Sequence, residues 1–211
     1  MKKYILILAV SVFLTSCKDF KKSIDDTLTS PGSAGDSVQT QNLDFQSTES
    51  SNTENIPFTS QSEKLELAEQ QLRDLPRFKG NSIYLYQHIH FYPDGRIIAK
   101  FQTPENPDFV DEYTYRDGQW QEPEPVILSK NDDVQADLIN LDQFPFKNVY
   151  NVFKVLAEKD KEIGSHNENQ VISASRRKNR IVWQPGSIEN ERYRYDIEYN
   201  EDGTLKSFEQ R

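Results

Sequence analysis

The pattern of hydrophobic and polar positions divides the chain into three parts. An apolar run covers residues 4–13, directly after Lys2 and Lys3. Residues 23–60 are mostly small or polar, and their few apolar side chains follow neither a helical nor a strand period. From residue 61 onwards apolar residues recur with regular spacing. We therefore expect an N-terminal signal at 1–16, a disordered polar tether at 17–60 and a globular region at 61–211.

Helical spacing occurs twice in the globular region. A capping-box pattern, Ser60-Gln61-Ser62-Glu63, precedes the first helix, and Pro76 follows its last apolar position. The apolar stripe of this helix consists of Leu65, Ala68, Leu72 and Leu75. A second helix is expected to begin near Pro145 and to end near Gly164. Its apolar stripe consists of Phe146, Val149, Phe153, Leu156 and Ala157.

A β-hairpin is predicted between the two helices. Residues 92–96, Tyr-Pro-Asp-Gly-Arg, have the composition of a tight turn. If the turn closes there, Phe91 faces Ile97, Ile89 faces Ala99 and Gln87 faces Phe101. This register places most aliphatic side chains on one face of the hairpin. The other face of the first strand then carries Tyr84, Tyr86, His88, His90 and Tyr92.

Further strands are expected near 111–116, 119–128, 171–176, 180–184, 191–199 and 204–208. The element order therefore predicts an α+β fold, in which an antiparallel sheet carries helices on one face. Each half of the region reads as one helix followed by about four strands. This order suggests a tandem duplication of an α-β-β-β-β unit at 61–128 and 144–211, with one continuous domain as the alternative. It resembles PepSY-like and β-lactamase-inhibitor-like domains, and more loosely cystatin-like folds.

The first part of the chain ends at Leu14-Thr15-Ser16-Cys17. The preceding apolar run is too short to span a membrane as a helix, which requires about 20 apolar residues. This arrangement resembles the signal peptide and lipobox of bacterial lipoproteins. The resemblance implies that residues 1–16 are removed and that lipid is attached to the Cys17 thiol. The alternatives are a short anchor helix and an ordinary signal peptide with an incidental cysteine.

The lipobox resemblance places the protein at the cell envelope, bound to the membrane through Cys17. The residue after Cys17 is Lys18 and not aspartate, so we expect the outer membrane, on its periplasmic or surface face. Cys17 is the only cysteine, which excludes disulfides and a cysteine nucleophile from the globular region. The net charge of −9 and the expected location argue against nucleic acid as a partner.

No catalytic signature accompanies this organisation. The chain lacks the His-Glu-x-x-His, Gly-x-Ser-x-Gly and Gly-x-Gly-x-x-Gly patterns and has no phosphate-binding loop. We therefore predict a non-enzymatic binding module without a cofactor, whose partner is an envelope protein or the cell wall. The candidate binding face consists of Tyr84, Tyr86, His88, His90 and Tyr92, since tyrosines are common in binding hot spots. The alternative is that these side chains are packed under another part of the fold.

Three further possibilities follow from residue types. His88 and His90 lie on one face of the strand and, with a third ligand, could bind Zn²⁺ or Cu²⁺. A solvated pair of histidines is the alternative. The basic run at 176–180 could meet an acidic partner or anionic lipid, or form a solvated turn. An envelope hydrolase with a site built from scattered Ser, Asp and Glu is the least favoured function.

Overall fold

The computed structural model describes residues 56–165, 167, 170–178 and 180–211. The predicted signal, Cys17 and most of the predicted tether lie outside these residues. Two helices are present in the described part, α1 (Ser62–Arg73) and α2 (Asn148–Ile163). Neither is long and apolar enough to cross a membrane.

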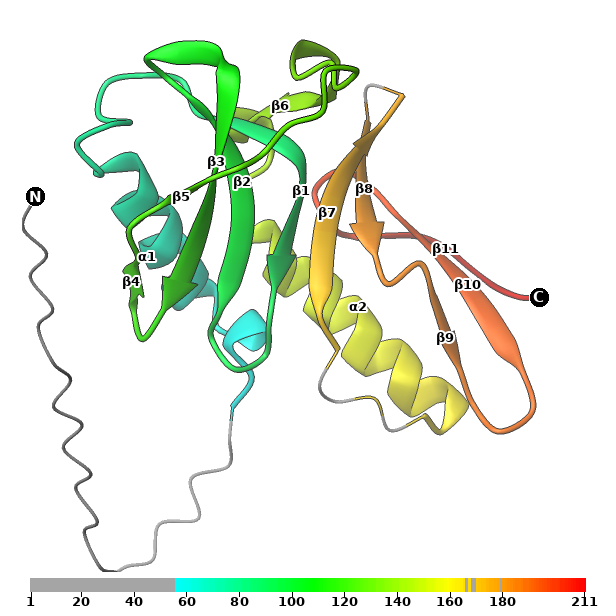
Figure 1. The fold of residues 1–211 in the computed structure, drawn as a ribbon. Coiled ribbons are helices and arrows are strands. Elements are labelled where there is room, and N and C mark those ends of the chain that lie inside the picture. The colour runs from blue at the N-terminus through cyan, green and yellow to red at the C-terminus, as the bar shows by residue number, and fades with distance from the viewer. Residues whose placement is uncertain (1–55, 166, 168–169, 179) are drawn as a thin grey trace, which may run out of the picture. The chain divides into compact units, whose positions relative to one another are not determined.

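The larger of the two described sheets is antiparallel and has eight strands. Six of them follow the order β4-β3-β2-β1-β7-β8, while β5 pairs with β3 and β6 pairs with β1. The strands are β1 (Tyr84–Phe91), β2 (Ile97–Thr103), β3 (Asn106–Arg116), β4 (Gln119–Trp120), β5 (Glu124–Pro125), β6 (Leu138–Asn140), β7 (Ile172–Arg177) and β8 (Arg180–Gln184). Both helices lie behind this sheet in Figure 1. The predicted α+β class, with helices packed against an antiparallel sheet, is confirmed.

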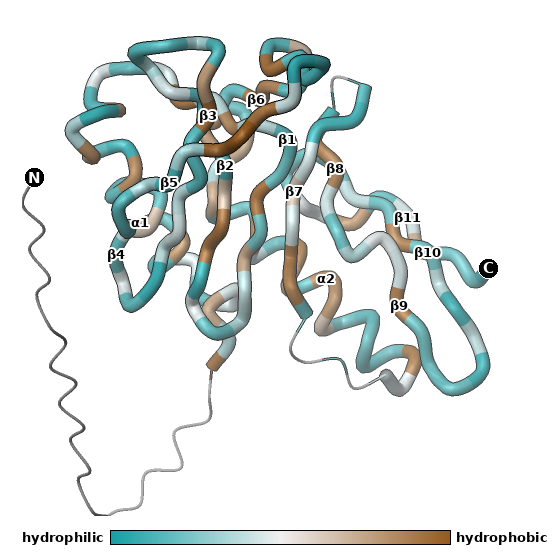
Figure 2. Tube along the Cα trace, viewed as in Figure 1, coloured by the Kyte–Doolittle hydropathy of each residue, from teal (hydrophilic) through white to brown (hydrophobic). Residues whose placement is uncertain are grey.

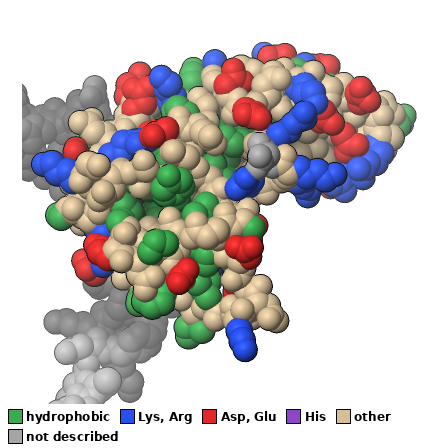
Figure 3. Space-filling view, turned by 90° about the horizontal axis from the view of Figure 1, so that it is seen from above, with side chains coloured by type: hydrophobic (Ala, Val, Ile, Leu, Met, Phe, Trp, Pro, Cys, Tyr) green, Lys and Arg blue, Asp and Glu red, His purple; other side chains and the backbone are tan. Residues whose placement is uncertain are grey.

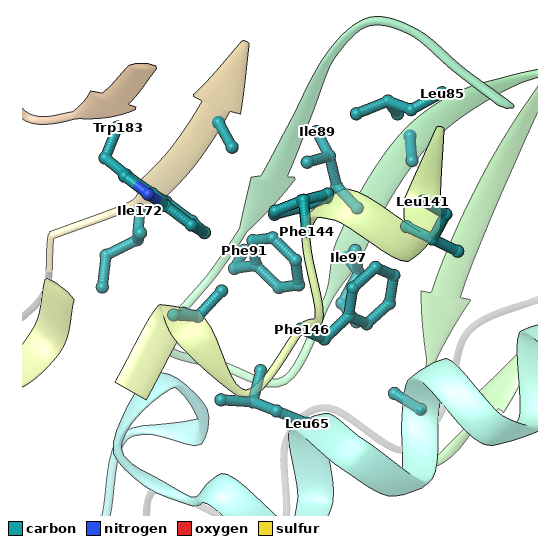
Figure 4. Close-up of a cluster of buried hydrophobic side chains, with 14 of the residues drawn as sticks. Leu65, Leu85, Ile89, Phe91, Ile97, Leu141, Phe144, Phe146, Ile172 and Trp183 are labelled. Atoms are coloured by element: carbon teal, nitrogen blue, oxygen red, sulfur yellow. The ribbon is translucent and has the colours of Figure 1, made fainter. Parts of the chain in front are cut away.

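The core lies between the sheet and the helices. Its helix side is formed by three of the four predicted stripe positions of α1 and by three residues of α2: Leu65, Ala68, Leu72, Val149, Val152 and Leu156. The fourth predicted position, Leu75, follows the end of α1 and is partly buried. Figure 4 shows how Phe91 and Ile89 of β1 face Phe144 and Phe146, which precede α2. The rings of Phe91 and Phe146 meet edge to face with centroids 5.1 Å apart. Aromatic pairs of this geometry stabilise a core beyond the area that they bury.

A second, smaller sheet has the order β11-β10-β9. Its strands are β9 (Ser187–Glu189), β10 (Arg194–Tyr199) and β11 (Leu205–Gln210). The turn between β10 and β11 packs against α2, where Asn151 Nδ2 donates to Asp202 O at 2.9 Å. Trp183 of β8 donates to Glu201 O at 3.0 Å and so ties the same turn to the larger sheet.

The two halves, 61–128 and 144–211, do not form separate sheets. β1 of the first half pairs with β7 of the second, and the second half then splits between two sheets. Buried residues of both halves also belong to one hydrophobic cluster. The expected order of one helix and then strands recurs in each half, but neither half has a core of its own.

Three boundaries and the burial of one residue differ from the sequence predictions. Phe58, assigned to the tether, is buried and its N–H donates to Pro93 O at 2.8 Å, so the packed chain begins before residue 61. The Ser60 hydroxyl donates to Pro57 O at 2.7 Å and does not cap α1, which starts at Ser62. A 3₁₀ turn over Phe58–Ser60 occupies the predicted capping position. α2 begins at Asn148, three residues after Pro145, and Ala157 is exposed.

The predicted hairpin register is correct near the turn and wrong further away. Phe91 pairs with Ile97 and Ile89 with Ala99, as expected, but Phe101 pairs with Leu85 and not with Gln87. A bulge lies between these pairs, and Gln87 has a positive φ of 63°. The Gln87 amide donates to the Tyr86 hydroxyl at 3.1 Å and to Asp137 Oδ2 at 3.4 Å. The side chain thus links the bulge to the segment that covers Tyr86.

Candidate functional site

The face of the larger sheet that is turned away from α1 and α2 carries the candidate residues. We call the part formed by β7, β1, β2 and β3 the outer face. The strand pairing places His88 beside Ser175 and His90 beside Ser173 on one side. On the other side His90 lies beside Ile98 of β2. Because neighbouring side chains on a strand alternate, the buried Ile89 points into the core and both histidines point outward.

A strap, residues 126–137, crosses the outer face after β5. Figure 2 shows its first residues as a hydrophobic stretch in front of the sheet. Val126 and Leu128 of the strap pack against a small buried cluster of Tyr86, Val110 and Val134. Ile127, between them, points away from the sheet and is 99% exposed. The strap therefore covers one end of the outer face and leaves the end near the histidines open.

The structure brings together three of the five predicted binding residues. His88, His90 and Tyr92 follow one another along the open part of β1, with ring centroids 4.7 Å and 6.4 Å apart. Tyr86 is only 3% exposed and is packed under the strap, so it is removed from the candidate binding face. Tyr84 lies at the other end of β1, beside Asn140 of β6. Its side chain does not join the histidines because Tyr86 and the strap lie between them.

Charged side chains surround the two histidines in the open part of the outer face, where Lys100 of β2 pairs with Glu112 of β3. Burial lowers the pKa of His88, and nearby Lys100 acts in the same direction while Glu112 opposes it. Burial also lowers the pKa of His90, with smaller contributions from His88 and Lys100. The Arg96 guanidinium lies 4.3 Å from the centre of the Tyr92 ring and is held by Asp94 at 2.8 Å. The two imidazoles are therefore neutral hydrogen-bonding groups at pH 7.

Acidification is expected to destabilise the fold through these two histidines. Because their pKa values are lowered in the folded state, the unfolded chain binds more protons below its ordinary histidine pKa of about 6.5. Their contribution to stability is complete above this pH and is lost as the pH falls through the lower folded-state values. A His88→Gln/His90→Gln variant should show a smaller drop in Tm between pH 7.5 and pH 5 than the parent. An equal drop in both proteins would contradict the assignment, since the carboxylates are the same in each.

The histidine pair has no third ligand partner in the part of the chain that the structure describes. Within these residues no group of three or more His, Cys, Asp or Glu side chains is placed to hold a metal ion. Zn²⁺ sites in proteins use three or four such ligands. Two imidazoles on an open sheet face offer only a weak site, so the metal-binding alternative has little geometric support.

The side chains of the basic run at 176–180 differ in their surroundings. Arg176 Nη1 donates to Leu138 O at 2.6 Å and to Ala136 O at 3.3 Å, so this residue holds the strap. Arg177, Lys178 and Arg180 are exposed at the β7–β8 turn. Figure 3 shows Lys and Arg side chains grouped on the side of the molecule that carries this turn.

The sequence pattern did not single out two residues that the structure makes prominent. Ile127 stands in the apolar run Val126-Ile127-Leu128, in which an extended strap must turn one side chain outward. Asp160 occupies a position that continues the buried stripe of α2 after Val149, Val152 and Leu156. The helical spacing places this acidic residue at a position that faces the core, so the sequence alone could have identified Asp160 as unusual.

No protein-family model, curated protein or solved structure matches this chain. The assignment of a function therefore depends on the geometry of the described residues and on the sequence features of the N-terminal part.

Proposed function

We propose that this protein is a lipid-anchored, non-enzymatic binding module of the cell envelope. Its partner is an envelope protein, which it takes on the outer face at Ile127 and at the open row of His88, His90 and Tyr92. The lipobox pattern at 14–17 supports the anchor and the location. The full exposure of Ile127 on the strap is the observation that carries the binding assignment.

A fully exposed isoleucine on an ordered segment favours a protein partner. The Val126 N–H donates to Val110 O at 2.9 Å and so fixes the strap to β3 directly before Ile127. Burying a side chain of this size contributes about 1.5–3 kcal/mol. A protein can cover this apolar side chain, whereas a cell-wall polysaccharide offers mainly polar surface.

The histidine row complements this apolar contact. Neutral imidazoles can donate and accept hydrogen bonds without the large desolvation cost of a buried charge. Ser173 and Ser175, which lie beside them on β7, add hydroxyl groups. An apolar anchor beside satisfied polar groups is the usual composition of a protein–protein contact.

Photo-crosslinking tests the location of the contact. A photoreactive phenylalanine analogue at Ile127 or at His90 is expected to capture the same protein in intact cells. The matched control places the analogue at Leu67 of α1, which is 49% exposed on the helix side. Capture from Leu67 alone, or equal capture of the same protein from all three positions, would exclude the outer face as the site.

An Ile127→Asp variant is expected to weaken binding of the captured partner at least about tenfold. The substitution removes the apolar contact and forces the partner to cover a charge. Because the side chain is exposed, the Tm should change little. Binding is measured with the purified partner, and Leu67→Asp, which makes the same chemical change on α1, should bind like the parent. Unchanged affinity of Ile127→Asp would refute the proposal.

A further inference from the structure

The strand β8 ends the larger sheet on the side of the smaller sheet (Figure 1). β7 pairs with one edge of β8, and no strand in the described part of the chain pairs with the other edge. β10 pairs with β9 and follows the chain back only as far as Gly186, whose carbonyl accepts the Ile197 N–H at 2.9 Å. Beyond this bond a cleft of about 620 Å³, lined by residues of both strands, lies between β8 and β10.

The backbone of β8 presents hydrogen-bonding groups to this cleft. In an antiparallel sheet, consecutive residues direct their N–H and C=O groups alternately to the two neighbouring strands. The Tyr92 N–H donates to Arg96 O on the β2 side of the chain, and the pairing of β1 with β7 and of β7 with β8 carries the alternation onward. It directs the backbone groups of Val182 to β7 and those of Ile181 and Trp183 to the cleft. An open strand edge of this kind is a template for another extended chain.

The cleft is basic at the end where β8 begins. Arg177, Lys178 and Arg180 line this end and are exposed. They form no ion pair with any described side chain. Glu198, the only acidic residue among the described lining residues, is paired with Lys206 at 2.8 Å. Charge complementarity therefore favours an acidic occupant.

We propose that an extended, acidic peptide segment of a partner protein binds in this cleft as an additional strand on β8. Its backbone pairs with the N–H and C=O groups of Ile181 and Trp183, and its acidic side chains lie near Arg177 and Arg180. In this mode of recognition the main-chain hydrogen bonds give affinity and the side chains give specificity. The site is an edge of the sheet and not its outer face, so it does not depend on the protein partner proposed above.

Two peptides that differ only in charge test this assignment. Because the larger sheet is antiparallel and Arg180 begins β8, the acidic residues are placed at the C-terminal end of the probe. The chain from Lys18 to Arg211, which contains every described residue, is titrated with acetyl-Thr-Val-Thr-Val-Asp-Asp-amide and with the same peptide ending in Lys-Lys. At low ionic strength the acidic peptide is expected to bind at least about tenfold more tightly, because the exchange replaces attraction by repulsion. Equal affinities would overturn the proposal.

Amide hydrogen exchange, followed by NMR, locates the bound peptide. The N–H groups of Ile181 and Trp183 are expected to exchange more slowly in the complex, whereas that of Val182 is already bonded to β7 and should change little. Slower exchange confined to other strands would contradict the location.

Methylation of the peptide nitrogens separates strand addition from a contact of charges alone. Two analogues of the acidic peptide carry equal numbers of N-methyl groups, one on the odd residues and the other on the even residues. Alternate N–H groups of a strand point to opposite edges, so only one analogue is expected to lose binding. The alternation of Thr and Val opposes a shift by one residue, which would turn every side chain to the other face. Equal affinities of the two analogues would exclude an added strand.

A charge reversal tests the basic end of the cleft. Arg180→Glu is expected to weaken binding of the acidic peptide at least about tenfold with little change in Tm, because the side chain is exposed. The matched control, Arg116→Glu, makes the same change at an exposed arginine beside the turn between β3 and β4 and should bind like the parent. An equal loss in both variants would show that only net charge matters. If phosphatidylglycerol vesicles bind the parent but not Arg180→Glu, and the acidic peptide leaves Ile181 N–H unprotected, the basic end contacts lipid and the peptide proposal is wrong.

Discussion

A Cys17→Ser variant is expected to carry no lipid. Diacylglyceryl transfer requires a thiolate nucleophile, and the pKa of a serine hydroxyl is too high for it to take this role. If lipidation precedes cleavage, as the lipobox resemblance implies, the variant should also retain residues 1–16. Metabolic labelling with an alkyne fatty acid, followed by gel electrophoresis, measures both effects. The parent should appear as a labelled band and the variant as an unlabelled, larger band.

Two controls separate the lipobox from the thiol itself. A Cys17→Ser/Ser23→Cys variant keeps one thiol but moves it away from Leu14-Thr15-Ser16, and should remain unlabelled. Ser16→Ala keeps a small residue before Cys17 and should be labelled like the parent. Label on Cys17→Ser, or on the relocated cysteine, would show that the pattern at 14–17 is not a lipobox.

Lipid attachment would place the proposed binding faces near a membrane surface. Each buried CH₂ group of an acyl chain contributes roughly 0.8 kcal/mol, so several chains hold a protein durably. If residues 18–55 form the flexible coil that the sequence predicts, the ends of this segment are roughly 35 Å apart on average. A partner that meets Ile127 and the histidine row would then lie close to the membrane that holds the anchor. This restriction favours other membrane-bound envelope proteins over freely diffusing ones.

Local signals predicted the hairpin between β1 and β2 but not the bulge within it. The turn at 92–96 forms as expected, with Tyr92 N–H donating to Arg96 O at 2.9 Å. The residue types of the turn determine only the pairing of the strand residues closest to it. Further along, the register changes at Gln87, whose partners are the Tyr86 hydroxyl and Asp137, 50 residues away. A pattern of alternating side chains contains no information about such a distant contact.

Non-local pairing also explains why the candidate face was predicted only in part. The period-2 pattern correctly turned His88, His90 and Tyr92 outward, but Tyr86 turned outward as well and was then covered by the strap. Whether an outward side chain is exposed depends on where a later segment crosses the sheet. The same limitation applies to β7, whose pairing with β1 joins residues about 85 positions apart. The helices were easier to predict because their apolar stripes are local.

A Gly203→Ala variant is expected to be destabilised by about 2–4 kcal/mol. Gly203 lies in the turn between β10 and β11 and has a φ of 81°, which disfavours any residue with a Cβ. A Cβ at this position would also lie 2.6 Å from Asn148 O and 2.9 Å from Val152 Cγ2. Both atoms belong to α2, so either the turn or the helix must move. Urea unfolding measures the decrease in the free energy of unfolding. We also expect the smaller sheet to detach more readily from α2.

Gly118 provides a matched control for the part of the destabilisation that comes from backbone strain alone. It also follows an aspartate in a hairpin turn and also has a φ of 81°, but a Cβ there would meet nothing within 4 Å. Gly118→Ala should therefore cost only the strain of the left-handed backbone, about 1 kcal/mol. The difference between the two variants isolates the close approach of the turn to α2. Equal destabilisation would mean that Gly203 is needed for its conformation alone, and that the contact between the smaller sheet and α2 is loose enough to absorb a methyl group.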